Sequence, residues 1–278
     1  MDFGEDTLQV GGLTLTGVAR GGIGTSLRVA ELGVLFDVGV PVSGQLKNAR
    51  ILVSHGHQDH LGGLPYLLSQ RHMMQQEPSE VHVPIEILDP LQRIFAAWSE
   101  IEDFDMETRL HGQSPGDVVQ VRKGIEAVAV RSVHRVPSLA WVVRRSTMRL
   151  IAEFADLPGE QIQALRAQGK TVTEPHVEPV LCVTGDTTIE LFDREPLVRQ
   201  AKVLVHEVTS WDERRGVEHT RKWGHTHVEE IIERAERFEG EALVLVHRSA
   251  RHSKAEAEQV VAQRFPASVR DKVHVFGN

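Results

Sequence analysis

Short apolar runs separated by glycine-rich or polar turns recur along the chain, a pattern typical of buried β-strands. Most runs are too short for a helix and are rich in Val, Ile and Leu. Strands are therefore predicted at 13–18, 27–30, 34–38, 51–54, 81–84, 118–121, 127–133, 139–144, 150–154, 180–184, 203–205, 243–246 and 273–276.

Other segments carry helical spacing or helix start signals. Asp89-Pro90 places Pro at a first helical position, and Thr226-His227-Val228-Glu229 and Ser253-Lys254-Ala255-Glu256 have the form of capping boxes. Helices are predicted at 61–73, 89–101, 158–169, 226–238 and 253–264, and a polar loop at 211–224. Because no repeat or linker divides the chain, we expect one domain spanning residues 1–278.

Several predicted strands end in side chains that bind metals. A lone His at a strand end is usually an ordinary surface or core residue. Several such ends favour a shared site, because ligands on strand ends along one rim of a sheet are rigidly held and can converge. The strand ends in question carry His55, His134, Asp186, His206 and His247.

The densest group follows the strand at 51–54 and reads Ser54-His55-Gly56-His57-Gln58-Asp59-His60. Imidazole and carboxylate ligands suit zinc, with Mn²⁺ or Fe²⁺ as alternatives. Four such side chains within six residues cannot easily converge on one ion, so the spacing predicts two neighbouring metals. The alternative interpretation is a polar loop that happens to be rich in His.

The simplest assembly shares seven ligands between two ions. One ion receives His55, His57 and His134, the other Asp59, His60 and His247, and Asp186 bridges them. Two metals ~3.5–4 Å apart activate water and clamp an in-line displacement, which suits ester or phosphodiester hydrolysis. The residues therefore predict a metal-dependent hydrolase with two Zn²⁺.

Composition narrows the setting of this activity. The net charge of −8 argues against a protein that coats nucleic acid through its overall charge, although a local basic patch is still possible. The single Cys182 allows no internal disulfide, which fits a reducing compartment. The acidic start has no signal-peptide character and no apolar run approaches membrane-spanning length, so we expect no membrane association and a cytoplasmic enzyme.

The ligand pattern resembles that of the metallo-β-lactamase superfamily, which implies an α/β fold, the four-layer αββα sandwich, with a dinuclear site along its edge. Finer motifs resemble ribonuclease Z, the tRNA 3′-processing endoribonuclease, over nearly the whole chain. They are Leu35-Phe36-Asp37-Val38-Gly39, Gly62-Gly63-Leu64-Pro65, Thr184-Gly185-Asp186-Thr187 and Val246-His247-Arg248-Ser249. By this resemblance Asp37 orients a ligand imidazole, and the protein forms a homodimer.

The most specific match is His206-Glu207-Val208-Thr209 followed by Gly224-His225-Thr226. In ribonuclease Z the corresponding segments serve phosphodiester chemistry. The resemblance implies that His225 protonates the leaving 3′-oxygen and that Glu207 orients His225 and keeps it positively charged. Asp59 is predicted to be catalytic as well as a metal ligand. A capping-loop His beside a solvated Glu is the alternative.

Ribonuclease Z also grips tRNA with a flexible arm inserted between the third His and the bridging Asp. Here that interval, 135–185, is predicted to hold only short strands and one helix, too little for a full arm. Basic residues near the site motifs could face phosphate or could be solvated loop charges: Arg131, Arg135, Arg214, Arg215, Arg221, Lys222, Arg248, Arg251 and Lys254.

Three functions remain. The first is a ribonuclease Z-type phosphodiesterase acting on RNA, tRNA or a smaller phosphodiester. The second is a carboxyl-ester, lactone or β-lactam hydrolase on the same metals, which has no evident need for Glu207 and His225. The third is a metal-stabilised binding protein, which is disfavoured because no ligand position has been replaced.

Overall fold

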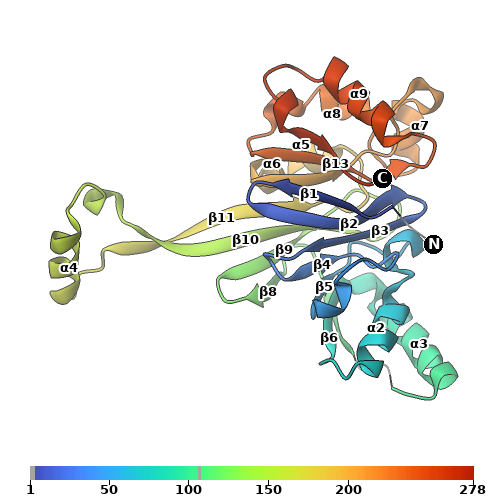
Figure 1. Ribbon diagram of the computed structural model, residues 1–278, viewed down its shortest axis with the longest axis horizontal. Helices are drawn as coiled ribbons and strands as arrows, with labels where there is room; N and C mark the ends of the chain where they lie inside the picture. Colours follow the sequence, from blue (N-terminus) through green and yellow to red (C-terminus); the bar gives the residue numbers. More distant parts are fainter. Residues whose placement is uncertain (1–3, 106–107) are drawn as a thin grey trace.

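The computed structural model describes residues 4–105 and 108–278. Two mixed sheets pack face to face, and helices cover the outer face of each, so the described chain has four layers (Figure 1). The predicted αββα sandwich is confirmed, and all thirteen predicted strand positions but 150–154 fall on or within two residues of observed strands.

The first sheet has eight strands within the described residues and runs in the order β1 to β7, with β14 beside β2. Pairing is antiparallel from β1 to β4 and parallel from β4 to β7. Its strands are β1 (Asp6–Val10), β2 (Leu13–Gly21), β3 (Gly24–Val29), β4 (Val34–Phe36), β5 (Arg50–Leu52), β6 (Ser79–Pro84), β7 (Thr108–Gln113) and β14 (Arg248–Ser249).

The second sheet has seven strands within the same described part of the chain, in the order β15-β13-β12-β11-β10-β9-β8. The pairs from β11 to β15 are parallel, so the carboxyl ends of β11, β12 and β13 lie along one edge. The strands are β8 (Val118–Arg122), β9 (Ile125–Arg131), β10 (Leu139–Leu150), β11 (Thr173–Val183), β12 (Val203–Glu207), β13 (Ala242–Val246) and β15 (Val273–Val275).

Three apolar clusters fill the spaces between the layers. The central cluster lies between the sheets and includes Trp141, which is 1% exposed and donates its ring N–H to the carbonyl of Val53 at 3.1 Å. Burying a whole indole together with its N–H partner is a strong tie between sheets. This tie fixes β10 of one sheet against the segment that follows β5 of the other.

Helices form the two outer layers. One layer holds α1 (Gln58–Leu61), α2 (Leu64–Met73) and α3 (Ile85–Glu102), which cover the first sheet. The other covers the second sheet and holds α5 (Glu190–Arg194), α6 (Pro196–Gln200), α7 (Val217–Lys222), α8 (Val228–Ile232) and α9 (Lys254–Arg264). Short 3₁₀ turns lie at Gln45–Lys47, Ala152–Phe154, Glu213–Arg215, Ala235–Arg237 and Arg270–Lys272.

The interval between the third His and the bridging Asp differs most from expectation. Instead of ending at 144, β10 continues to Leu150 and stays paired with β11, from Arg144 opposite Pro179 to Leu150 opposite Thr173. The two strands project from the body as a ribbon that carries α4 (Gly159–Ala167) at its far end (Figure 1). At ~3.3 Å per residue the extension of β10 beyond Arg144 reaches roughly 20 Å. The strands of this interval are therefore longer than predicted, and residues 144–179 are called the arm below.

Smaller differences concern helix ends and weakly patterned segments. The helix predicted from Asp89 begins at Ile85, with Pro90 inside it. The capping box predicted at Thr226 lies one residue later, where His227 caps α8 together with Glu230. The predicted loop 211–224 contains α7. The sequence pattern also missed strands β1 and β7, whose faces are only partly buried.

Candidate metal centre

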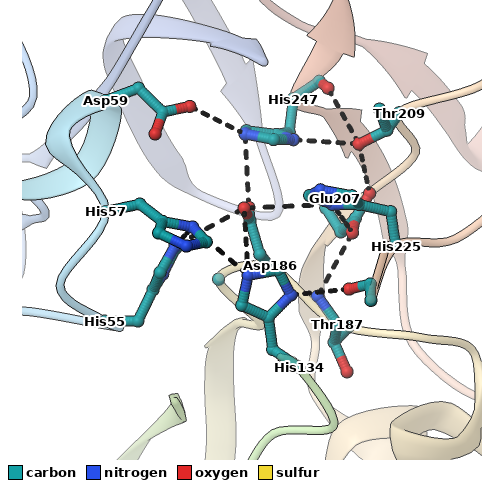
Figure 2. A network of polar contacts seen from close by, with 12 residues as sticks. His55, His57, Asp59, His134, Asp186, Thr187, Glu207, Thr209, His225 and His247 are labelled. Atoms are coloured by element: carbon teal, nitrogen blue, oxygen red, sulfur yellow. Dashed lines mark hydrogen bonds and ion pairs between the residues drawn. The ribbon is translucent and has the colours of Figure 1, made fainter. Parts of the chain in front are cut away.

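The candidate site lies where strands of both sheets end. His55 follows β5, His134 follows β9, and Asp186 and His247 follow β11 and β13. Asp186 is central, with the other labelled side chains arranged around it (Figure 2). Gly185, with φ +57°, turns the chain into Asp186, and a Cβ there would lie 2.4 Å from Cβ of Ser54. Only glycine therefore allows this close approach.

A first group of four donor atoms lies on one side of Asp186. Nε2 of His55 is 3.0 Å from Nδ1 of His57, which in turn is 3.3 Å from Nε2 of His134. Oδ2 of Asp186 lies 3.5 Å from His55 and 3.9 Å from His134. Three imidazole nitrogens and one carboxylate oxygen at these separations fit the donor set of a zinc ion.

A second group lies on the other side. Oδ1 of Asp186 is 3.2 Å from Nε2 of His60 and 3.3 Å from Nε2 of His247. Oδ2 of Asp59 lies 3.5 Å from His247 and 3.9 Å from His60. Asp186 thus presents one oxygen to each group, as a bridging carboxylate would. The structure brings together all seven residues predicted to bind the two metals.

Unsatisfied atoms at this second group support a metal. Nε2 of His60, Nε2 of His247 and Oδ1 of Asp186 are buried and have no hydrogen-bond partner among the described residues. Buried polar atoms without a partner are costly and uncommon. A cation that accepts all three lone pairs would remove this cost, so the residues present fit a dinuclear metal centre.

Hydrogen bonds behind the imidazoles turn their Nε2 atoms inward. His60 donates Nδ1–H to Asp37 at 2.7 Å, and His134 donates Nδ1–H to the carbonyl of Gly224 at 2.7 Å. Such outer contacts fix both tautomer and ring orientation. The predicted orienting role of Asp37 therefore has a direct contact behind it.

Two hydroxyls do the same for the rings of His55 and His247. Ser54 gives its hydroxyl hydrogen to Asp37 at 2.8 Å and accepts Nδ1–H of His55 at 3.0 Å. Thr209 gives its hydrogen to Glu207 at 2.9 Å and accepts Nδ1–H of His247 at 3.0 Å. Each ring is left with its Nε2 lone pair free for a ligand.

The charges of the site favour a cation. Burial lowers the pKa of His55, His57 and His134, which keeps these imidazoles neutral and able to bind metal. Burial would raise the pKa of Asp186, but the imidazoles of His247 and His60 beside it hold it well below its usual range. Burial would likewise raise the pKa of Asp59, yet its contact with His247 lowers it. Both carboxylates are therefore ionised at neutral pH.

Glu207 and His225 form a separate pair at the edge of the centre. His225 donates Nδ1–H to Oε1 of Glu207 at 2.8 Å, and its ring is stacked on that of His247 with centroids 5.4 Å apart. Burial would lower the pKa of His225, but the negative charge and hydrogen bond of Glu207 raise it to about 9. The imidazole is therefore cationic near pH 7, with its other nitrogen available to donate a proton.

Both carboxylate oxygens of Glu207 accept hydrogen bonds from the protein itself. Its Oε1 also accepts the backbone N–H of Thr187 at 3.2 Å and of Thr226 at 3.3 Å, while Oε2 accepts from Thr209. This differs from the unpartnered oxygen of Asp186. Although Glu207 and His225 lie close enough to Asp186 and His247 to form a third donor group, the satisfied oxygens favour an orienting role for Glu207.

One strand-end residue does not join the site. His206 is buried on the opposite face of β12, where Nδ1 donates to the carbonyl of Glu207 at 2.7 Å and the ring packs edge-on against Phe192. Successive side chains of a strand point to opposite faces. Because Glu207 faces the metal centre, His206 must face the helical layer.

Other contributors were not identified from the pattern. Thr209 and Ser54 were visible within the quoted motifs but were given no role, and the carbonyl of Gly224 and the N–H of Gly22 belong to the backbone. The N–H of Gly22 donates to Oδ2 of Asp59 at 2.8 Å. A hydroxyl directly beside a ligand His was the available signal for Ser54.

The nine basic residues divide into three kinds. Arg248 is buried and donates to the carbonyls of His252 and Gly277, so it cannot face a substrate. Arg214, Arg221 and Lys254 form ion pairs with carboxylates. Within the described residues no carboxylate pairs with the remaining exposed cations, which are Arg131, Arg135, Arg215, Lys222 and Arg251.

Comparisons with known proteins agree with this site. The sequence model of the beta-lactamase superfamily domain matches residues 38–248. The chain is 31% identical to tRNase Z TRZ1 of Arabidopsis thaliana over 260 residues, which is 93% of each chain.

Similar folds occur among solved structures. The metallo-beta-lactamase fold protein YhfI from Bacillus subtilis is 13% identical, with a TM-score of 0.64 and 94% of each chain covered. Human tRNase Z, short form, is 18% identical, with a TM-score of 0.59 and coverage of 94% of this chain and 95% of that one. The predicted resemblance to ribonuclease Z is confirmed: the chain belongs to the tRNase Z family of the beta-lactamase superfamily and is a metal-dependent hydrolase.

Proposed function

We propose that this protein is an endoribonuclease that cleaves a phosphodiester bond beyond the 3′ end of a tRNA. The observation that carries the proposal is the Glu207–His225 pair beside the metal centre. Hydrolysis of a carboxyl ester, lactone or β-lactam has no evident need for it. Cleavage of RNA does, because an alkoxide 3′-oxygen is a poor leaving group and departs faster when it is protonated.

Two Zn²⁺ ions are the proposed cofactors, with Mn²⁺ or Fe²⁺ as alternatives. His55, His57 and His134 would hold one ion, Asp59, His60 and His247 the other, and Asp186 both. When bound, the pair would supply Lewis acidity and an activated water at neutral pH. Histidine and carboxylate donors without a thiolate suit these metals.

His225 is the proposed general acid. Attack of water on phosphorus forms a new P–O bond as the P–O3′ bond breaks, and the proton on Nε2 of His225 passes to the departing O3′. The upstream RNA then ends in a 3′-hydroxyl and the trailer in a 5′-phosphate. Glu207 acts by holding Nδ1 and by stabilising the positive charge on the ring.

Asp59 is the third proposed catalytic residue. It is ionised, and its Oδ2 is anchored by the N–H of Gly22 and lies close to His247. A carboxylate in this place can accept a hydrogen bond from the attacking water and take up its proton. This function adds to the role of Asp59 as a ligand.

The arm supports a large, folded RNA as the substrate. In the family, such an arm grips tRNA, and the arm of this chain projects well beyond the body (Figure 1). Its five basic residues, Arg144, Arg145, Arg149, Arg166 and Lys170, are balanced by Glu153, Asp156, Glu160, Glu174 and Glu178. We therefore expect the arm to recognise RNA shape, while the unpaired cations near the site contact phosphate.

A homodimer is the proposed assembly. Large apolar side chains are exposed on or beside α2 and α3, and exposed apolar patches often mark protein contacts. They are Tyr66, Met73, Met74, Ile94, Trp98 and Ile101. No helix of the described residues is long and apolar enough to cross a membrane. The cytoplasm is the proposed compartment, supported by a single, buried cysteine.

A substrate panel tests the function. Purified protein loaded with Zn²⁺ or Mn²⁺ is given a tRNA with a 3′ trailer, a chromogenic phosphodiester, a lactone and a β-lactam. We expect cleavage of the tRNA to a 3′-hydroxyl and a 5′-phosphate. Turnover of the lactone or β-lactam alone contradicts the proposal.

A further inference from the structure

A cavity of about 210 Å³ adjoins the metal centre on the side of His225. One wall belongs to the segment after β12 and the other to α7 and the residues that follow it. Its lining includes Thr209, Ser210, Arg215, His219, Trp223 and His225. Of these, Thr209 and His225 are already part of the hydrogen-bonded network around Glu207 (Figure 2). The cavity therefore opens directly beside the proposed general acid.

Trp223 is the unusual member of this wall. Its side chain is 48% exposed, although an indole gains a large hydrophobic free energy from burial. The guanidinium of Arg135 lies over the ring, 4.5 Å from the centroid. Arg135 is itself exposed and has no carboxylate partner among the described residues. A planar cation stacked on an exposed indole is an arrangement used for stacking nucleobases.

The position of Trp223 is fixed from both sides. Gly224, the next residue, has φ +79° and accepts Nδ1–H of His134 at 2.7 Å. The backbone N–H groups of Trp223 and His225 donate to the carbonyl of Thr220 at 3.1 and 3.2 Å. The indole is thus tied by backbone contacts to a metal ligand and to the proposed general acid.

The base of α7 is also anchored. The hydroxyl of Thr220 donates to Oγ of Ser210 at 2.8 Å, across the two walls of the cavity. Arg215 and His219 are exposed at the rim, and neither forms an ion pair with a described carboxylate. The cavity therefore combines a rigid aromatic wall, hydroxyl groups and an unpaired cation, which together suit an aromatic heterocycle that is linked to phosphate.

We propose that this cavity binds the nucleobase of the nucleotide immediately upstream of the cleaved bond, stacked against Trp223. This inference rests on the proposed RNA cleavage. His225 gives its proton to O3′, and O3′ belongs to the ribose of the upstream nucleotide. Because the cavity begins at His225, the base on that ribose is the group placed to enter it. Trp223 is then a positioning and specificity residue, and Arg135 supports its ring.

The test combines a protein change with a substrate change. The wild type and Trp223→Ala cleave two RNAs that differ only in having a base or an abasic ribose at the nucleotide upstream of the cut. Loss of one stacked base costs ~1–3 kcal/mol, which is roughly a 5- to 150-fold rise in KM. We expect this rise for the abasic RNA with the wild type, and a ratio near one with Trp223→Ala. Trp223→Phe, which keeps an aromatic face, should restore most of the ratio.

Two controls locate the effect, and a third checks that the metal centre is intact. Val118→Ala shortens an exposed apolar side chain on β8, the edge strand of the second sheet, and should keep the wild-type ratio. An abasic ribose at the nucleotide downstream of the cut should change KM by the same factor in the wild type and in Trp223→Ala. Metal content of Trp223→Ala, measured by mass spectrometry, should match that of the wild type.

The outcomes separate this inference from the function on which it rests. A wild type that cleaves RNA with equal KM for base-bearing and abasic substrates overturns the stacking inference alone. So does a Trp223→Ala protein that keeps the wild-type ratio. A wild type that cleaves none of the RNAs overturns both the inference and the proposed function.

Discussion

The Nδ1–H of His225 donates to Oε1 of Glu207 at 2.8 Å, and the same oxygen accepts two backbone N–H groups. Glu207 is 1% exposed on its side chain and ends strand β12, so its position is set by the sheet. His225 follows α7 in a different part of the chain. The pair therefore couples a rigid element to the more exposed segment that faces the cavity beside the site.

The contact predicts what happens when Glu207 loses its charge. Glu207→Gln should lower kcat for RNA about 10- to 100-fold, since the cationic form of His225 loses its partner. Metal content should stay at the wild-type value, because both oxygens of Glu207 are bonded within the protein. Glu230→Gln, a change of a buried Glu in α8, serves as the control and should keep kcat. Loss of one metal per chain in Glu207→Gln would identify Glu207 as a ligand.

Asp37 should control metal affinity without touching the metal. Its carboxylate accepts the N–H of Ser54 at 2.6 Å and orients His60. Asp37→Asn tolerates the native φ of +56° but cannot accept every one of these bonds. Removing such outer contacts typically weakens metal binding ~10- to 100-fold.

A chelator titration followed by metal analysis checks this prediction, with the exposed Asp117→Asn as the control. Equal zinc retention by Asp37→Asn and Asp117→Asn would show that Asp37 does not support metal binding.

His82 should make folding stability depend on pH. It is 7% exposed, both ring nitrogens lack a partner within the described residues, and burial lowers its pKa to about 4. Below pH 6.5 His82 binds a proton in the unfolded chain but not in the folded chain. The free energy of unfolding therefore decreases as the pH is lowered. The loss at pH 5 is about 2 kcal/mol, or roughly 4–8 °C in Tm for a chain of this size.

His82→Phe keeps the ring that stacks on His111 but removes the proton site. Between pH 7.5 and 5 its Tm should therefore fall by roughly 4–8 °C less than that of the wild type. The exposed His72→Phe should follow the wild type. Equal falls for His82→Phe and the wild type would show that His82 does not titrate as described.

The arm can be removed without disturbing the core. Joining Ser146 to Val177 through Asn-Gly closes the paired strands with a two-residue hairpin turn. Turnover of a small phosphodiester should be retained, whereas KM for the tRNA precursor should rise about tenfold or more because remote binding contacts are lost. An unchanged KM for the precursor would mean that the arm does not contact this RNA.

The metal-binding strand ends could be predicted from the sequence because two features coincide there. An apolar run indicates a strand, and the His or Asp that follows it is a residue type that binds metals. The extension of β10 could not be predicted. Beyond Arg144 neither face of the ribbon is well buried, so no alternation of apolar and polar residues records it. Helix α7 was missed for a similar reason, since Thr220 is its one buried residue.

The side of the sheet that a residue faces and the residue that caps a helix were harder to predict than the positions of the strands and helices. His206 and Glu207 both end a strand, and only the register of β12 decides which one reaches the metals. The cap of α8 was misplaced by one residue because Thr226 and His227 both offer a capping atom. In the fold the hydroxyl of Thr226 donates instead to the carbonyl of Thr187.

The proton transfer from His225 can be tested with RNA whose scissile 3′-oxygen is replaced by sulfur. A thiolate leaves without protonation, so it makes a general acid unnecessary. His225→Ala should slow cleavage of normal RNA ~10²- to 10⁴-fold and cleave the 3′-thio RNA at close to the wild-type rate. An equal loss of rate on both RNAs would contradict the account, because His225 would then serve the site in some way other than protonating the leaving group.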